Sequence, residues 1–184
     1  MDVKKTIKVF LCDADYVFLN YFVANIPCWW IRKLFYLLHG MKLGKKSRIN
    51  MKCIVYAPWK ISVGENTVVN EHVLLDGRGH LTIGDNVAIS MFSILYTASH
   101  YSRSPDFQYY TKPSALHSGV WIGARAIIMP GSEIGECSII SANSVYSGGK
   151  SERMTVYRGN PAEACGERKL ETDSVRQKTI MFFK

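Results

Sequence analysis

The fold is decided by residues 122–140, IGARAIIMPGSEIGECSII, in which an isoleucine returns at every sixth position. A helix would space its apolar residues three and four apart, and a lone amphipathic strand would alternate them by two. One inward aliphatic residue in every six instead suits short strands joined by tight corners. Glycine follows several of these aliphatic residues, and we expect it, with asparagine, to adopt the backbone angles that the corners demand.

The same spacing extends outward over most of the chain. Stepping by six residues inside each block always meets an aliphatic residue, although Ile, Leu and Val make up under a quarter of the sequence. These positions are Leu43, Ile49, Val55, Val63, Val69, Leu75, Ile83, Ile89, Leu95, Ile122, Ile128, Ile134 and Ile140. Three six-residue sides close a coil of about 18 residues, and two-residue offsets at Ile61-Ser62 and Leu81-Thr82 fall between coils. We therefore predict a mainly β solenoid of parallel, stacked coils around an aliphatic column.

The repeat divides the chain into three parts. It spans residues 43–146 and is interrupted by a protruding loop at 96–119, and a long excursion from a compact solenoid is usually functional. Residues 1–42 form an N-terminal helical segment, with two short helices over 15–39 that Pro27 and Gly40 help to delimit. Residues 147–184 are expected to form a C-terminal loop and tail with a short terminal helix.

Composition narrows the class of protein further. The 184 residues suit one domain with appendages, and the five scattered cysteines indicate free thiols in a reducing cytoplasm. We expect no signal peptide, and the uncharged stretch 16–31 is too short and too interrupted to span a membrane. The formal net charge of +8 favours an anionic partner. Because the basic residues are dispersed and match no nucleic-acid-binding signature, we expect no nucleic-acid partner.

The recurring aliphatic-Gly-x-x blocks, such as Ile83-Gly84-Asp85-Asn86, resemble those of the hexapeptide-repeat acyltransferases. The resemblance implies a left-handed parallel β-helix, and the handedness comes from the resemblance alone. In the galactoside and maltose O-acetyltransferases of this family, an Ile-Gly-Asp-Asn-Val block precedes the catalytic histidine by the spacing that separates residues 83–87 from His100. The resemblance therefore implies that His100 is a general base, a role that suits a side chain titrating near neutrality.

Three further residues are implied at the site by the same resemblance. Asn70 matches an active-site asparagine that would orient the acceptor or hold the tautomer of His100, with a simple corner asparagine as the alternative. Asp76 lies near the family's acidic position, where a carboxylate would raise the basicity of His100 and fix its ring, unless it only forms a turn. Trp121 matches a substrate-binding tryptophan that lines the site, with core packing as the alternative.

The resemblance also implies acetyl-CoA as the acetyl donor, because residues 140–145 and 159–162 are similar to the family's acetyl-CoA region. Small residues would let the pantetheine arm lie along the coil edge, and cations would meet its phosphates, with tight packing and solvated surface as the alternatives. The candidates are Ala124, Ala142, Lys150, Arg158 and Pro161. No metal is expected, since the histidines lack the spacing of a zinc site.

The resemblance implies direct transfer of the acetyl group from acetyl-CoA to the acceptor, with no acyl-enzyme. It also implies a homotrimer whose sites lie between subunits.

Residues 20–60 resemble exopolysaccharide, capsule and O-antigen sugar O-acetyltransferases, so we expect a saccharide acceptor in surface polysaccharide biosynthesis. We expect this saccharide to be lipid-linked and to meet the enzyme at the cytoplasmic face of the membrane. The Trp-rich segment 16–39 either touches that membrane or only caps the first coil. Two alternatives stay open: an acetyltransferase for an antibiotic, serine or an amino sugar, and a non-catalytic β-helix that binds or assembles other molecules.

Overall fold

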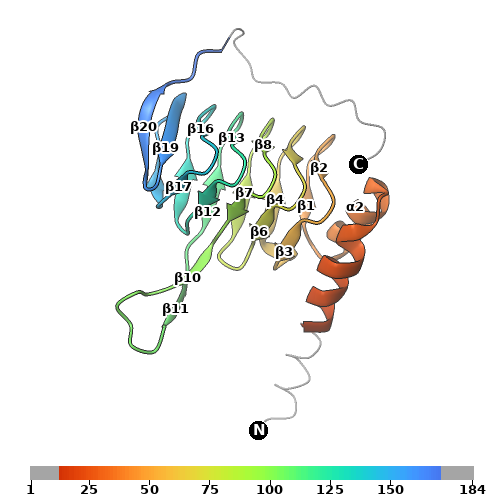
Figure 1. The fold of residues 1–184 in the computed structure, drawn as a ribbon. Helices are drawn as coiled ribbons and strands as arrows, with labels where there is room; N and C mark the ends of the chain where they lie inside the picture. The colour runs from red at the N-terminus through yellow and green to blue at the C-terminus, as the bar shows by residue number, and fades with distance from the viewer. Residues whose placement is uncertain (1–12, 171–184) are drawn as a thin grey trace.

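The computed structural model describes residues 13–170, so residues 1–12 and 171–184 of the expected terminal segments lie outside it. The chain winds into a three-sided solenoid, seen from the side in Figure 1, with one parallel sheet on each side. Face A contains β1 (Lys42–Leu43), β4 (Ile61–Val63), β7 (Leu81–Ile83), β12 (Ser114–Leu116), β15 (Ser132–Ile134) and β18 (Gly149–Lys150). Face B contains β2 (Arg48–Ile49), β5 (Val68–Val69), β8 (Ala88–Ile89), β13 (Trp121–Ile122), β16 (Ile139–Ile140), β19 (Thr155–Gly159) and β20 (Ala162–Glu167). Face C contains β3 (Ile54–Tyr56), β6 (Leu74–Asp76), β9 (Ile94–Leu95), β14 (Ile127–Ile128) and β17 (Val145–Tyr146).

The chain visits faces A, B and C in that order and then begins the next coil, so face C meets face A along one edge, here called the C–A edge. The corner between faces B and C is called the B–C edge. Ser62 on β4 pairs with Thr82 on β7, which gives this coil 20 residues, whereas Ala115 on β12 pairs with Glu133 on β15, 18 residues later. The two additional residues fall at the C–A edge, where the sequence offsets indicated them.

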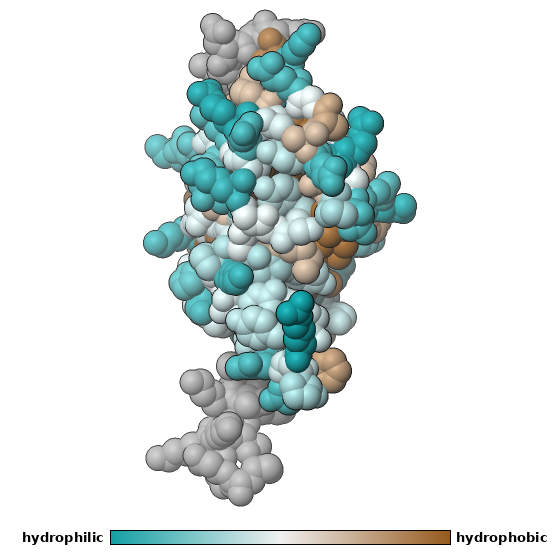
Figure 2. All heavy atoms as spheres, turned by 90° about the vertical axis from the view of Figure 1, so that its left-hand side faces the viewer, coloured by the Kyte–Doolittle hydropathy of each residue, from teal (hydrophilic) through white to brown (hydrophobic). Residues whose placement is uncertain are grey.

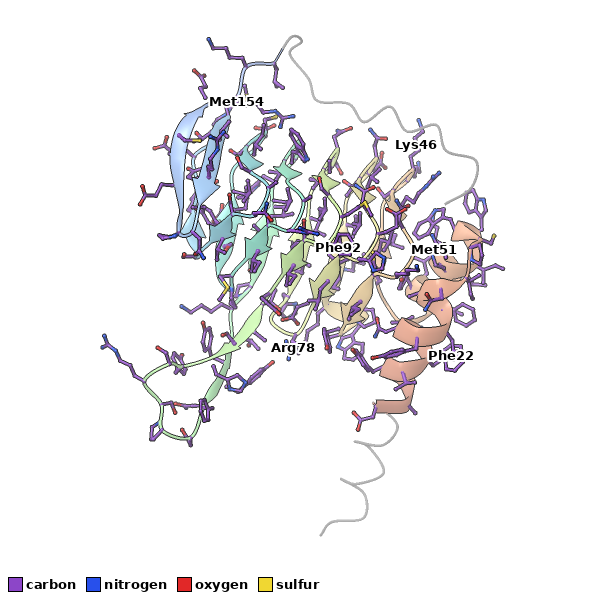
Figure 3. All side chains as sticks on the ribbon, viewed as in Figure 1. Phe22, Lys46, Met51, Arg78, Phe92 and Met154 are labelled. Carbon is purple, nitrogen blue, oxygen red and sulfur yellow. The ribbon has the colours of Figure 1, made fainter. Side chains whose placement is uncertain are left out.

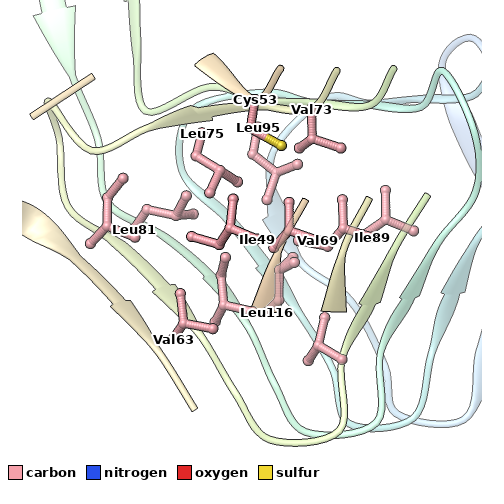
Figure 4. Packing of buried hydrophobic residues seen from close by; sticks show 14 of the residues in the cluster. Ile49, Cys53, Val63, Val69, Val73, Leu75, Leu81, Ile89, Leu95 and Leu116 are labelled. Atoms are coloured by element: carbon pink, nitrogen blue, oxygen red, sulfur yellow. The ribbon is translucent and has the colours of Figure 1, made fainter. Parts of the chain in front are cut away.

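The aliphatic column is the core of the solenoid. Of the thirteen positions set by the six-residue repeat, all are buried except Leu43, which is partly buried against the same cluster. Figure 4 shows Ile49, Val69 and Ile89 in one row, each from the next coil. Each fully buried aliphatic side chain contributes about 1.5–3 kcal/mol, so the repeat itself stabilises the stack. The β-helix predicted from the six-residue period is confirmed.

The repeat glycines have a different role from the one expected. Gly64 and Gly123 do not adopt positive φ, and a Cβ on Gly123 would lie 2.4 Å from the backbone nitrogen of Ala142 in the next coil. Glycine is therefore required for close approach between coils. The left-handed conformation falls two residues later, at positions such as Asn66 (φ 51°) and Asn86 (φ 55°), so the expectation for asparagine is confirmed.

Helices close the N-terminal end of the solenoid, and the two expected short helices are confirmed. The first is helical over 13–17 and continues through η1 (Phe18–Phe22) and η2 (Val23–Asn25), and α2 (Trp29–Leu38) follows. One side of this cap packs on the first coil through Leu19, Trp29 and Tyr36, which are almost fully buried. Arg32 is also buried, and its guanidinium donates to the carbonyl oxygens of Ile26, Pro27 and Ile49. Within residues 13–170 no helix has the length and apolar character needed to cross a membrane.

The excursion from the solenoid is an antiparallel hairpin of β10 (Ala98–His100) and β11 (Tyr109–Thr111), which projects from the C–A edge (Figure 1). It is narrower than the loop expected at 96–119, because β12 has rejoined face A by Ser114. The C-terminal part also differs from the expected loop and short helix. Parallel pairing continues through β18 and β19, and β20 folds back on β19. Tyr157 on β19 continues the core by packing edge-on against Tyr146.

Candidate active site

His100 ends strand β10, where the hairpin leaves the C–A edge. Its ring is exposed, and across the hairpin it pairs in register with Tyr109, whose ring lies 5.7 Å away in an edge-on arrangement. Nδ1 of His100 is hydrogen-bonded to the carbonyl oxygen of Phe107. A carbonyl oxygen can only accept, so Nδ1 carries a hydrogen, and in the neutral form of the ring Nε2 is then the nitrogen with the lone pair. The hairpin thus presents an oriented imidazole with a free basic nitrogen.

The root of this hairpin is attached to the coil below it by Asp76. The carboxylate is fully buried and accepts hydrogen bonds from the backbone N–H of Thr97 at 3.0 Å and from Arg78. The Arg78 guanidinium makes a two-pronged contact, with Nε at 2.8 Å from Oδ1 and Nη2 at 3.1 Å from Oδ2. Thr97 Oγ1 in turn donates to the Asp76 carbonyl oxygen at 2.7 Å. Asp76 therefore holds the start of β10 rather than the ring of His100.

The ion pair between Asp76 and Arg78 favours the charged form of both side chains. Burial alone would raise the pKa of Asp76, but hydrogen bonds from the Arg78 side chain and from the backbone N–H groups of Thr97 and Arg78 outweigh it, so the pKa lies below its ordinary value. The pKa of Arg78 is raised by its hydrogen bond to the same carboxylate. The result is a fixed cation at the foot of the hairpin, labelled in Figure 3.

Aromatic rings flank this cation and form a row along the C–A edge. The Arg78 guanidinium lies 4.9 Å from the ring centre of Tyr56 in the first coil and 5.9 Å from that of Tyr109. Tyr56 is in turn stacked on Tyr16 of the cap, with ring centres 5.0 Å apart. We call Tyr16, Tyr56, Arg78, Tyr109 and His100 the aromatic row. It connects the helical cap to His100.

Trp121 lies on the opposite side of the molecule from His100. It stands at the start of β13 on face B, its side chain is 45% exposed, and its indole N–H donates to Ser90 Oγ at 3.0 Å. The core-packing alternative for Trp121 is therefore wrong. In a three-sided coil the C–A edge is the corner opposite face B, so one chain cannot bring Trp121 and His100 together.

Asn70 turns the B–C edge and is also away from the hairpin. Its side-chain amide donates to the carbonyl oxygen of Ile89 in the next coil at 2.9 Å, and its Oδ1 lies 3.4 Å from the Asn50 amide nitrogen. Within one chain, Asn70 therefore makes the contacts expected of an asparagine that stabilises a corner of the coil.

The donor-binding candidates occupy three places. Ala124 and Ala142 stack on the B–C edge, where Asn143 N–H donates to the Ala124 carbonyl oxygen at 3.0 Å. Arg158 is exposed on β19, and Pro161 stands in the β19–β20 turn.

Lys150 lies apart from the other donor-binding candidates, on strand β18 of face A. It borders an open cavity of about 710 Å³ that Glu133, Glu136 and Glu152 also line. The Lys150 ammonium lies 3.2 Å from the Glu133 carboxylate, which partly neutralises it. Within residues 13–170, no cluster of three or more His, Cys, Asp or Glu side chains is placed to hold a metal ion.

Sequence reasoning did not identify three residues that contact His100 or its support, namely Phe107, Tyr109 and Arg78. Arg78 stands two positions after Asp76, a spacing that permits a local ion pair, and this was the available signal. Tyr109 could have been found only by recognising that the excursion is a hairpin, since its pairing with His100 depends on the strand register.

Comparison with known proteins fits this geometry. A family model described as bacterial transferase hexapeptide (six repeats) matches residues 113–145. WcaF of Escherichia coli K12, a protein assigned to colanic acid biosynthesis as an acetyltransferase, is 33% identical over 137 residues, which cover 74% of each chain. The galactoside O-acetyltransferase of the same organism is 32% identical over 90 residues, covering 47% of this chain and 44% of that enzyme. A hexapeptide-repeat acetyltransferase of Vibrio cholerae, solved with acetyl coenzyme A, superposes with a TM-score of 0.80 at 27% identity, covering 88% of this chain and 90% of that one.

A β-helix built on six-residue repeats, with a histidine presented on a protruding hairpin, defines a transferase scaffold. The chain belongs to the bacterial hexapeptide-repeat transferase family. Within that family it is an acetyltransferase.

Proposed function

We propose that this enzyme transfers the acetyl group of acetyl-CoA to a hydroxyl of a saccharide used in surface polysaccharide biosynthesis, with His100 as the general base. One observation carries the proposal. Phe107 holds the His100 ring through Nδ1, and this leaves Nε2 free at the exposed root of a hairpin. The relationships to WcaF and to the acetyl-CoA-bound Vibrio enzyme support the saccharide acceptor and the acetyl donor.

The reaction needs no covalent enzyme intermediate. Nε2 of His100 takes the proton of the acceptor hydroxyl as the oxygen attacks the thioester carbonyl. Backbone N–H groups stabilise the tetrahedral oxyanion. When this intermediate collapses, the carbon–sulfur bond breaks and the CoA thiolate takes the proton back from Nε2. Asp76 acts as a positioning residue, because it fixes Thr97 at the start of the strand that carries His100.

The site is shared between copies of the chain in a homotrimer. His100 of one copy faces Trp121 of the next, and that neighbour also supplies Asn70, Ala124 and Ala142 from its face B and B–C edge. The opposite placement of His100 and Trp121 in one chain supports this arrangement. Lys150, Arg158 and Pro161, near the C-terminal end of the solenoid, are the remaining candidates for contact with CoA.

The acceptor side is the aromatic row. Rings of Tyr56 and Tyr109 offer flat apolar faces of the kind on which sugars stack, and Arg78 between them provides a cation for an acidic or phosphate-bearing saccharide. We assign a lipid-linked saccharide to this row, met at the cytoplasmic face of the membrane.

The central test measures CoA thiol release from acetyl-CoA against a panel of saccharides. His100→Ala and His100→Asn should each lower kcat by on the order of 10²–10⁴, with acetyl-CoA binding kept. The Asn variant can still donate to the Phe107 carbonyl but has no basic nitrogen, so it separates catalysis from support of the hairpin. Glu65→Gln, at an exposed corner between faces A and B, is the control and should keep full turnover. Full activity in His100→Asn would refute the base, and turnover only with antibiotics, serine or amino sugars would refute the saccharide acceptor.

Mixed assemblies test the shared site. Neither His100→Ala nor Trp121→Ala homotrimers should turn over efficiently, but trimers formed by co-expression contain sites with both wild-type residues. Random mixing of equal amounts should restore about one quarter of wild-type activity, because each site takes one residue from each of two neighbours in a closed ring. No restoration in verified mixed trimers would refute a site built from His100 of one copy and Trp121 of the next.

A further inference from the structure

The outer side of the N-terminal cap is an exposed apolar surface. The most exposed side chains are Trp30 at 72%, Leu38 at 70% and Phe22 at 65%. The full set, here called the cap surface, is Val17, Phe18, Tyr21, Phe22, Trp30, Ile31, Leu34, Leu37 and Leu38. An apolar surface of this extent on a folded protein marks a contact with another body.

This exposure does not reflect a loosely attached helix. The opposite side of the same helices is anchored by buried Leu19, Val23, Trp29, Arg32 and Tyr36. The cap is therefore apolar on two sides, and packing on the first coil accounts for only one of them. The second side lies at the end of the solenoid, where Figure 3 labels Phe22.

The charge of the protein is concentrated beside this surface. Residues 13–64, which form the cap and the first coil, contain eight Lys and Arg residues against two acidic residues, Asp13 and Asp15. The whole chain has 23 basic and 15 acidic residues, so the remainder has 15 basic and 13 acidic residues and a net formal charge of only +2. The exposed lysines of the first coil are Lys42, Lys45, Lys46 and Lys52. Lys33 adds a cation on α2, with its ammonium 5.6 Å from the ring centre of Trp30.

The other end of the solenoid has the opposite character. Figure 2 looks onto that end, and hydrophilic side chains predominate there. Its outer strand β20 exposes Glu163 and Glu167. The molecule is thus polarised along the solenoid axis in its apolar surface, which lies at the cap end, whereas exposed cations at the far end, such as Arg158, stand among carboxylates.

We propose that the cap surface docks on an anionic lipid bilayer. Its Trp, Phe and Leu side chains enter the boundary between headgroups and acyl chains, and the lysines of the first coil meet the lipid phosphates. A second copy of the chain fits this surface poorly, since it would bring the exposed lysines of its own first coil against those of the first copy. With the cap on the bilayer, the solenoid axis stands away from the membrane plane.

The biological role that we give to this docking rests on the proposed function, in which the acceptor saccharide is lipid-linked. The aromatic row begins at Tyr16 in the cap and reaches Arg78 in the second coil and His100 in the third. Adjacent coils are separated by about 4.8 Å, so the foot of the hairpin lies on the order of 10 Å beyond the first coil. A saccharide carried by a lipid in the same bilayer can follow this row to His100.

Sedimentation with vesicles tests the docking directly. The full chain should bind vesicles of phosphatidylcholine with 30% phosphatidylglycerol, and binding should weaken at least tenfold on pure phosphatidylcholine. Lys46→Glu should weaken binding by roughly tenfold, since each cation near an anionic surface contributes about fivefold and the reversal adds repulsion. Lys169→Glu makes the same charge change at an exposed site on the other side of the fold and should leave binding unchanged. Equal loss in both variants would overturn the docking surface.

A second experiment removes apolar side chains from the cap surface. The triple change Trp30→Ser, Leu34→Ser and Leu38→Ser alters only exposed side chains, so the protein should fold and lose vesicle binding. If it instead keeps vesicle binding and changes its sedimentation coefficient, the cap surface is an interface between copies and the proposal is wrong. Thiol release with a soluble saccharide should be unaffected by the triple change. Loss of vesicle binding with that activity intact separates failure of docking from failure of the proposed function.

Discussion

Replacing Asp76 with Asn tests what holds the hairpin that carries His100. The buried carboxylate accepts hydrogen bonds from Arg78 Nε, Arg78 Nη2, the Arg78 backbone N–H and the Thr97 backbone N–H. Asn keeps the shape but offers one acceptor oxygen, and its NH₂ group must point at donors. At least two hydrogen bonds to a charged group are lost, at about 1.5–3 kcal/mol each. Because the Arg78 side chain is 39% exposed and can turn to water, we expect the lower end, about 3 kcal/mol in the free energy of unfolding.

Thermal unfolding followed by circular dichroism measures this loss. For a chain of this size about 1 kcal/mol corresponds to 2–4 °C, so the Tm of Asp76→Asn should fall by about 6–12 °C at pH 7. The folded pKa of Asp76 lies below its unfolded value, so its contribution is present above the unfolded pKa and is lost as pH falls through the folded pKa. The Tm difference should therefore be constant above about pH 5, begin to narrow below about pH 4 and close only as the pH falls past the folded pKa.

The kinetic readout separates support of the hairpin from tuning of the base. Since Asp76 bonds to Thr97 and Arg78, Asp76→Asn should lower kcat but leave the apparent pKa of the kcat/KM profile unchanged. Asp106→Asn, which removes an exposed carboxylate on the hairpin, is the control and should change stability by less than about 0.5 kcal/mol. A Tm difference that does not decrease as the pH falls below about 4, or a shifted kinetic pKa, would refute the reasoning.

Two stability predictions use the cap and the coil contacts. Arg32→Ala removes hydrogen bonds to three carbonyl oxygens and leaves a cavity, so Tm should fall by at least about 6 °C, whereas Lys33→Ala next to it should have little effect. Gly123→Ala places a Cβ 2.4 Å from the Ala142 nitrogen and should lower Tm by about 3–9 °C, whereas Gly166→Ala meets nothing within 4 Å. Differential scanning calorimetry checks both pairs, and a control that loses as much as its partner would contradict the assignment.

The sequence predicted the solenoid because its signal is local and repeated. Each short strand buries one aliphatic residue, and residues such as Ile83 and Ile89 take equivalent positions on successive sides of a coil. The same local signal located the interruption that became the hairpin. It also predicted left-handed corners at Asn66 and Asn86, since asparagine tolerates that conformation.

Contacts between coils could not be predicted in the same way. The role of Gly123 depends on the backbone of Ala142, and the partners of Asp76 depend on which residue of the third coil lies above it. The family resemblance implied that the Asp76 carboxylate neighbours His100, but the stacking of the coils places it against Thr97 and Arg78. The charge of the chain was likewise visible as a total, whereas its concentration in the cap and first coil acquired meaning only beside the exposed cap surface.

The separation of His100 and Trp121 illustrates why motif spacing underdetermines a site in a solenoid. The two residues are 21 positions apart, which is close to one coil, so an uninterrupted coil would place them near each other. The hairpin takes up residues 98–111 of that interval, and Trp121 consequently pairs in register with Ala88 on face B. A spacing that suggests proximity within one chain instead sets the two residues on opposite sides of the molecule. If both belong to one active site, a second copy must supply one of them, and the hairpin is the feature that makes this necessary.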